Sequence, residues 1–161
     1  MIKLIDVRKK YGERLILKEI NLTLPSHGLC VIYGPSGCGK TTLLNCIAGL
    51  IPFKGSIEVF NQNIALMNDR ALSDWRLKAI GFIFQDFKLF ETETVWRNLV
   101  LPLDTLHALP RRLRNRKCAD ILALVGLTSK RKQIDNKLSG GEKQRVAIAR
   151  AIINDPCVLL A

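Results

Sequence analysis

The sequence predicts an α/β fold, and three observations support this prediction. An apolar run at residues 29–33 leads into a glycine-rich stretch at residues 34–41 and then into a helical pattern, which is the order strand, turn, helix. A later helical pattern ends at Asp155-Pro156 and is followed by another apolar run. The chain has 161 residues, of which 48% are hydrophobic, and this suffices for one domain with its own core.

Local patterns place the elements along the chain. The expected strands are residues 2–7, 14–24, 29–33, 56–60, 80–84 and 157–161, with a turn at residues 9–12. The expected helices are residues 39–49, 71–79, 94–101, 110–125 and 139–153.

Proline and glycine set most of these boundaries. Pro25 closes the second strand, and Pro52 follows the first helix. We expect Pro102 to stop the helix at residues 94–101, because proline lacks the N–H that a helix interior needs. Pro110 suits a first helical turn, and Gly126 ends the helix that starts there.

The stretch at residues 34–41 has the spacing Gly, four residues, Gly-Lys-Thr, which is typical of a phosphate-binding loop. Its glycines allow turns that bring successive N–H groups together, and the helix beginning near Gly39 adds partial positive charge. Lys40 supplies a mobile charge for the outer phosphates, and the Thr41 hydroxyl is a hard oxygen ligand suited to Mg²⁺. We therefore predict that this loop binds a nucleoside triphosphate.

A second anion site is predicted where the last helix begins. Ser139 and Glu142 have the spacing of a capping box. Gly140 and Gly141 disfavour a helix but leave bare N–H groups at its N-terminus, which suits an anion.

Three further features have both a functional and a structural interpretation. Tyr11 is either an aromatic packed at a strand end or a platform for a base. Gln85 follows an apolar strand and is either a turn residue or a contact for water or Mg²⁺. The apolar residues Phe87, Leu89 and Phe90 lie on a connection and either pack locally or form a docking surface for a partner.

The formal net charge is +11, and a basic run extends from residue 111 to residue 132. It contains Asp120 as its only acid and the bases Arg111, Arg112, Arg114, Arg116, Lys117, Lys130, Arg131 and Lys132. The run fits a solvated helix face, a face near anionic lipid, or a nucleic-acid patch. No aromatic residue is interleaved with these charges, which weakens the nucleic-acid interpretation.

The cysteines indicate a reducing compartment. They form no C-x-x-C pair and are odd in number: Cys30, Cys38, Cys46, Cys118 and Cys157. Alkylation of Cys38, inside the glycine-rich stretch, is expected to block nucleotide binding. Since the N-terminus lacks the apolar core of a signal peptide, we expect a cytoplasmic protein unless a partner holds it at a membrane.

Residues 34–41 and 138–144 together resemble the ATP-binding subunit of an ABC transporter, and the resemblance extends over the chain in order. Residues 34–41 match the Walker A loop, and Gln85 matches the Q-loop. Residues 138–144 match the signature motif, with Glu142 in place of the commoner Gln. Tyr11 falls where the family has its adenine-stacking aromatic. Residues 80–85, 94–102 and 158–161 are similar to the exporter group that handles lipoproteins, macrolides or antimicrobial peptides.

This resemblance implies a P-loop NTPase fold with an N-terminal antiparallel β subdomain and an inserted helical subdomain. The nucleotide-binding core would comprise residues 1–85 and 153–161, and the helical subdomain residues 86–152. The implied cofactors are ATP and Mg²⁺. Lys40 and Gln85 would act in catalysis, and Thr41 and Gln85 would contact the metal. The implied nucleotide-binding residues are Tyr11, Gly34, Pro35, Ser36, Gly37, Cys38, Gly39, Lys40, Thr41, Thr42, Ser139, Gly140, Gly141 and Glu142.

The resemblance also implies partners. Two subunits would pair head to tail, so that each signature motif faces the ATP held by the other subunit. A membrane permease would dock near Phe87, Leu89 and Phe90 and hold the protein at the inner face of the cell membrane, and nucleic acid would not be a partner. The alternatives are a soluble ABC ATPase acting on ribosomes or nucleic acid through the basic run, and a non-catalytic nucleotide-binding fragment.

The last residues match the apolar half of a Walker B strand, and the Walker B acids, the D-loop and the switch histidine are not matched. Neither His27 nor His107 falls in a matching context. We therefore expect an N-terminal fragment of a longer protein, with a parallel sheet that is incomplete beside the Walker A strand. We expect this chain by itself not to turn over ATP.

Overall fold

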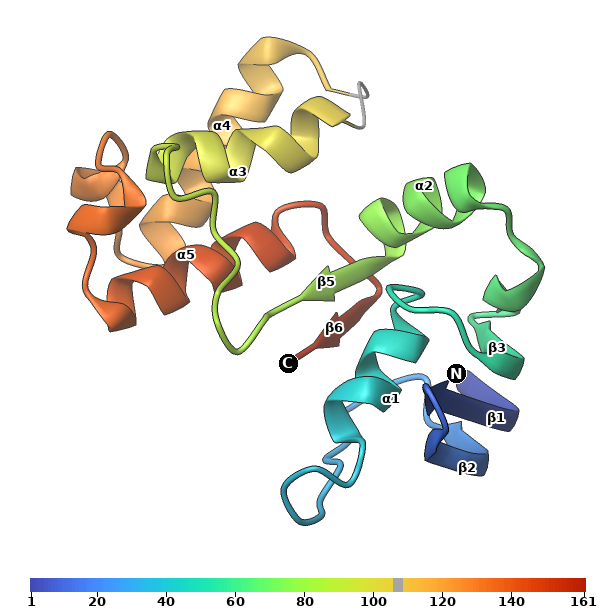
Figure 1. Cartoon of the computed structure of the whole chain (residues 1–161). Coiled ribbons are helices and arrows are strands. Elements are labelled where there is room, and N and C mark those ends of the chain that lie inside the picture. Colours follow the sequence, from blue (N-terminus) through green and yellow to red (C-terminus); the bar gives the residue numbers. More distant parts are fainter. Residues whose placement is uncertain (106–108) are drawn as a thin grey trace. The chain divides into compact units, whose positions relative to one another are not determined.

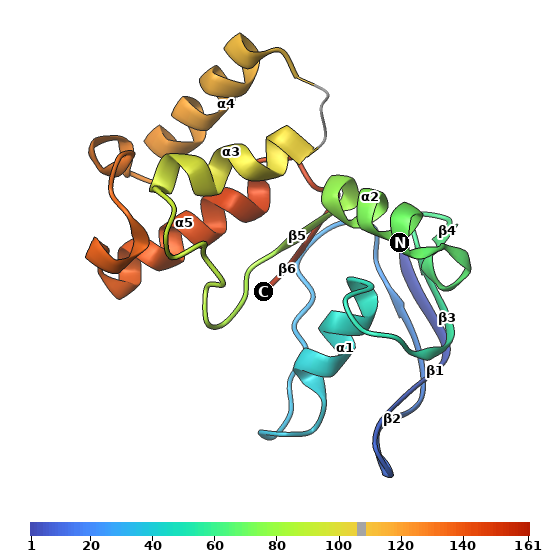
Figure 2. The same cartoon turned by 45° about the horizontal axis from the view of Figure 1, so that its top comes forward.

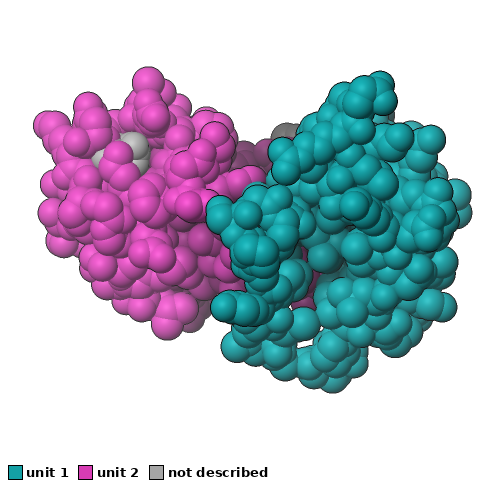
Figure 3. All heavy atoms as spheres, turned by 60° about the horizontal axis from the view of Figure 1, so that its bottom comes forward, with its two compact units in different colours: residues 1–73 teal, residues 74–161 magenta. Residues whose placement is uncertain are grey.

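The computed structural model describes residues 1–105 and 109–161 and divides the chain into two units, Met1–Ser73 and Asp74–Ala161 (Figure 3). The first unit is built around an antiparallel sheet, and the second around three helices and a short parallel sheet. The predicted division into a core and a helical subdomain stays a prediction.

The antiparallel sheet of the first unit has the strand order β2-β1-β3-β4, and its four strands are labelled in Figure 2. Its strands are β1 (Ile2–Tyr11), β2 (Arg14–Leu24), β3 (Lys54–Val59) and β4 (Gln62–Asn63). The bounds of β2 are those predicted, whereas β1 extends through the predicted turn, because Lys9 pairs with Leu17 and Tyr11 with Arg14. Alternation along β1 buries Ile2 and Leu4, and after a register shift at Asp6, whose φ angle is +51°, Val7 is buried as well.

Helices and a short 3₁₀ segment complete this part of the chain. Helix α1 (Lys40–Ile47) lies against β2 and buries Leu43, Cys46 and Ile47. The 3₁₀ helix η1 (Ile64–Leu66) follows β4, and helix α2 (Asp69–Ala79) continues from the first unit into the second.

The predicted strand at residues 29–33 is wrong. Leu29, Val31 and Tyr33 are 91%, 75% and 97% exposed, and no described residue forms a ladder with this segment. An apolar run becomes a strand only when a neighbouring backbone takes up its N–H and C=O groups. Among the described residues, the parallel sheet consists only of the pair β5 and β6, and residues 29–33 do not pair with it.

The second unit contains a parallel pair of strands, β5 (Ile80–Phe82) and β6 (Val158–Leu160). Ile80 lies opposite Val158, and the Ile83 N–H extends the pairing to the Leu160 carbonyl at 2.8 Å. A Cβ atom on Gly81 would lie 2.3 Å from the carbonyl oxygen of Ala151, in the helix Gly140–Ile152, so this strand can approach that helix only with glycine there.

Three helices form the larger part of the second unit: α3 (Val95–Thr105), α4 (Arg111–Leu124) and α5 (Gly140–Ile152). Helix α3 lies between the other two (Figures 1 and 2). Their shared helical core consists of Val95, Leu99, Val100, Leu103, Cys118, Leu122, Leu127, Leu138, Val146, Ala149 and Ile153. Two 3₁₀ segments, η2 (Thr128–Lys130) and η3 (Asp135–Lys137), connect α4 to α5.

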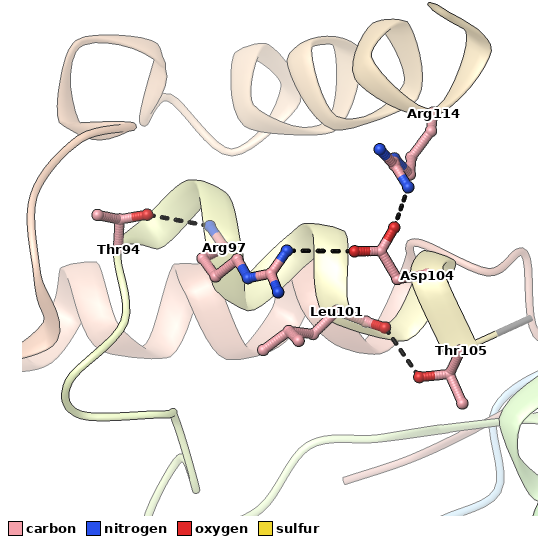
Figure 4. A network of polar contacts seen from close by, with 6 residues as sticks. All are labelled: Thr94, Arg97, Leu101, Asp104, Thr105 and Arg114. Atoms are coloured by element: carbon pink, nitrogen blue, oxygen red, sulfur yellow. Dashed lines mark hydrogen bonds and ion pairs between the residues drawn. The ribbon is translucent and has the colours of Figure 1, made fainter. Parts of the chain in front are cut away.

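Pro102 does not stop α3, which corrects the sequence prediction. The helix continues to Thr105 with Pro102 inside it. The turn after Pro102 is held by tertiary contacts, because Leu103 is buried in the helical core and Asp104 accepts hydrogen bonds from Arg97 and from Arg114 of α4 (Figure 4). These contacts offset the lost backbone hydrogen bond.

Candidate nucleotide-binding site

The glycine-rich loop leads into the start of α1 through two left-handed glycines. Gly37 and Gly39 have φ angles of +76° and +102°, which favour glycine. Gly39 is also required by packing, since a Cβ atom there would lie 2.9 Å from Cγ2 of Ile16 on β2. The residues between the outer glycines, Ser36 and Cys38 among them, are exposed.

The Lys40 side chain folds back into this loop. Its Nζ donates hydrogen bonds to the carbonyl oxygens of Gly34 and Pro35, both at 2.8 Å, and lies 3.9 Å from the Cys38 sulfur. The first turn of α1 has no acidic residue and no side-chain cap. The loop therefore combines an ammonium group with the partial positive charge of a helix N-terminus.

Tyr11 ends β1 with half of its side chain exposed. The ammonium group of Lys9 lies 5.0 Å from the Tyr11 ring centroid and donates a 2.6 Å hydrogen bond to the Pro52 carbonyl. Lys9 thus covers one ring face and ties it to the segment after α1. Both interpretations of Tyr11 remain compatible with this position, and Lys9 is a neighbour that sequence reasoning missed.

The predicted capping box at the start of α5 is confirmed. Ser139 Oγ accepts a hydrogen bond from the Glu142 N–H at 3.3 Å, and Glu142 Oε2 accepts one from the Ser139 N–H at 2.8 Å. The second bond, together with Lys130 3.3 Å from Glu142 Oε1, lowers the pKa of Glu142. This carboxylate therefore stays ionised while it caps the helix.

Gly140 and Gly141 are exposed, and packing against residues 1–105 and 109–161 does not require glycine at either position. A Cβ atom on Gly140 would meet nothing within 4 Å, and one on Gly141 would meet only the Arg145 guanidinium at 3.8 Å. The space above the first turn of α5 is therefore open to a ligand or a partner, as a second anion site needs.

Gln85 is exposed and begins a segment that two side chains hold in place. Phe87 and Lys88 have φ angles of +60° and +48°, a strained conformation for these residues. Arg150 of α5 donates hydrogen bonds to both of their carbonyl oxygens, at 2.8 and 2.5 Å.

Asn98 of α3 holds the end of the same segment. This side chain is 1% exposed and exchanges hydrogen bonds with the backbone N–H and C=O of Phe90, at 2.9 and 3.3 Å. Sequence reasoning missed both Arg150 and Asn98. A polar residue within the apolar stripe of a helix was the available signal for Asn98.

The predicted site residues fall into two groups. Tyr11 and the glycine-rich loop, including Thr41 and Thr42, belong to the first unit. Gln85 and the start of α5 belong to the second. Of the two histidines, His27 is exposed and His107 lies outside the described residues.

The donor set suits Mg²⁺ rather than a metal held by protein side chains alone. Within residues 1–105 and 109–161, no group of three or more His, Cys, Asp or Glu side chains is placed to hold a metal ion. The exposed Thr41 hydroxyl and the exposed Gln85 amide are hard oxygen donors, and Mg²⁺ takes few protein ligands when phosphates and water supply the rest. A search of the described helices found none long and apolar enough to cross a membrane.

The cysteines should separate into two reactivity classes. Cys30, Cys38 and Cys157 are exposed, whereas Cys46 and Cys118 are buried and desolvation raises the pKa of each to about 11. We expect a thiol reagent at neutral pH to label the three exposed cysteines quickly and the two buried ones only after unfolding. ATP should protect Cys38 specifically, and mass spectrometry of the labelled peptides measures this. Equal labelling of Cys38 with and without ATP would contradict a nucleotide seated on the loop.

Taken together, a lysine folded into a glycine-rich loop and a helix beginning directly behind it define a P-loop nucleotide-binding domain. The sequence profile of the ABC transporter family matches residues 17–161. This chain belongs to the ABC transporter family.

Relatives and solved structures agree with this assignment. The lipoprotein-releasing system ATP-binding protein LolD of Bacteroides thetaiotaomicron is 40% identical over 162 residues, which cover 100% of this chain and 74% of that protein. The methionine import ATP-binding protein MetN of Clostridioides difficile is 40% identical over 99% of this chain and 50% of that protein. The ATP-binding cassette MJ0796, in a dimeric post-hydrolysis state bound to ADP and Pi, matches with a TM-score of 0.90 and 36% identity over 99% of this chain and 72% of that chain.

Proposed function

We propose that this chain binds ATP and works as an energy-coupling subunit of a membrane transporter. The observation that carries the proposal is the Lys40 ammonium group, held inside the loop by the Gly34 and Pro35 carbonyls. When a triphosphate enters, its oxygens can replace these carbonyls as acceptors, while the loop N–H groups and the start of α1 stabilise the negative charge. Tyr11 supplies a ring for the adenine.

Thr41 in the first unit and, as a separate proposal, Gln85 in the second would each offer an oxygen ligand to Mg²⁺, which would neutralise phosphate charge when bound. This chain would position the ligand, because Lys40 and Thr41 are consecutive residues in the first turn of α1. Gln85, exposed in the segment that follows β5, is suited to orient water.

We propose that two copies pair head to tail around ATP, with the start of α5 facing the nucleotide on the partner. The open space above Gly140 and Gly141 supports this, because packing against the described residues of the chain does not require glycine there. The dimeric state of the MJ0796 cassette supports it further.

The test is nucleotide-dependent pairing measured by light scattering. ATP should raise the molar mass of the wild-type particle from that of a monomer to that of a dimer. Gly141→Asp should prevent this increase, because it adds bulk and negative charge at the nucleotide-facing turn. Ser129→Asp adds the same charge at an exposed residue of η2 and should pair normally. Unchanged pairing of Gly141→Asp would refute the head-to-tail arrangement.

We propose that the permease docks on residues 87–90 and so holds the subunit at the cytoplasmic face of the membrane. Phe90 is half exposed, whereas Leu89 packs against the helical core. Phe90→Asp should therefore abolish co-purification with the membrane subunit. Phe60→Asp, at another exposed phenylalanine, serves as the matched control. Equal recovery with both variants would exclude this docking segment.

A further inference from the structure

In the folded chain, Trp96 lies next to Arg131 of the basic run. Backbone hydrogen bonds join the start of α3 to the segment after η2: the Val95 N–H donates to the Gln133 carbonyl at 2.8 Å, and the Trp96 N–H to the Arg131 carbonyl at 2.9 Å. Thr94 and Ile134 form an antiparallel bridge beside them. These bonds fix Trp96 next to Arg131, although the two residues are far apart in the sequence.

Helix α4 supplies the opposite side of a cavity of about 610 Å³. Its lining residues are Thr94, Trp96, Asn115, Arg116, Ala119, Arg131 and Lys132. The volume lies within the range of small-molecule sites, about 300–1,000 Å³.

The polar groups that line this cavity are mainly donors. Arg116, Arg131 and Lys132 carry positive charge, and the Asn115 amide adds N–H donors. Asp120 is a weak competitor, since its carboxylate is 3.9 Å from Arg116 and both side chains are largely exposed. The cavity is therefore suited to an anion.

Arg131 is pre-organised for such a ligand. Its guanidinium lies over the Trp96 ring, 5.9 Å from the centroid. A stacked guanidinium keeps its N–H groups at the edge of the plane, where they match two oxygens of one phosphate.

The same stacking disfavours nucleic acid. Arg131 covers one face of the Trp96 ring, and the indole also packs against the helical core. A base would have to displace the Arg131 guanidinium to stack on this face of the Trp96 ring. The cavity therefore favours the binding of a phosphate group over the stacking of a base.

We propose that this cavity binds a phosphate-bearing anion, in the form of either an anionic phospholipid headgroup or a soluble phosphate ester. The site is distinct from the glycine-rich loop and does not depend on ATP. Through it, the helices of the second unit would respond to the membrane surface or to a metabolite.

Trp96 fluorescence tests this directly, because Trp75→Phe leaves it as the only tryptophan. In that background the protein is titrated with vesicles of equal parts phosphatidylglycerol and phosphatidylcholine, with pure phosphatidylcholine vesicles, and with glycerol phosphate. A saturable change with the anionic vesicles or with glycerol phosphate supports the proposal and identifies the source of the phosphate.

The double variant Arg116→Gln/Arg131→Gln should weaken this binding about tenfold, as loss of charge-assisted hydrogen bonds predicts. Arg111→Gln/Arg112→Gln removes the same charge from exposed residues outside the cavity and should change the binding affinity little. Arg131→Lys keeps the charge and should retain part of the binding, which would show that the loss in the double variant does not come from unfolding. The proposal is overturned if both double variants weaken binding equally, if no phosphate ligand binds, or if single-stranded RNA binds with the same dependence on Arg131.

Discussion

Lys40→Met is expected to weaken ATP binding about tenfold to a hundredfold, because it removes the charged donor for the outer phosphates while keeping the length of the side chain. The ammonium group lies inside the loop, where two 2.8 Å hydrogen bonds to carbonyl oxygens hold it, and phosphate oxygens would replace these acceptors when the triphosphate enters. Isothermal titration calorimetry with ATP measures the change.

Inorganic tripolyphosphate separates the role of Lys40 from that of the base platform. Lys40→Met should weaken ATP and tripolyphosphate alike, whereas Tyr11→Ala should weaken ATP only, since tripolyphosphate has no base to stack. Lys18→Met, at an exposed lysine of β2, is the control and should bind both ligands normally. Tight binding of ATP by Lys40→Met would contradict the proposed site.

Arg150→Met is expected to lower the free energy of unfolding by about 1–3 kcal/mol, because the carbonyl oxygens of Phe87 and Lys88 lose their donors. Burial lowers the pKa of Arg150, so desolvation opposes its charge, and the two carbonyls compensate. Arg150→Lys should recover only part of the loss, since one ammonium group lacks the planar fork. Urea denaturation measures these changes.

Hydrogen exchange locates the effect of Arg150. The amides of residues 87–90 should exchange faster in Arg150→Met than in the wild type, because the positive φ angles of Phe87 and Lys88 persist only while their surroundings hold them. Arg145→Met changes an exposed arginine of the same helix and should leave this segment protected. A stable Arg150→Met protein with normal exchange would show that Arg150 does not hold the segment.

Short-range chemistry in the sequence determined the glycine-rich loop, the capping box of Ser139 and Glu142, and the bounds of β2. These features depend on residues a few positions apart, so local spacing contains their whole cause. The type of nucleotide site followed from the same local patterns.

Only the tertiary structure decided features that depend on contacts between distant segments. Residues 29–33 have a strand composition but pair with no strand in the described part of the chain. Helix α3 continues past Pro102 because Asp104 and Leu103 contact residues outside their own turn. The contact of Trp96 with Arg131 of the basic run, and that of Arg150 with the Phe87 carbonyl, also join segments that are far apart in the sequence. A single sequence records which side chains can form such contacts, but the folded chain selects the partners, because each contact requires two segments to be brought together at once.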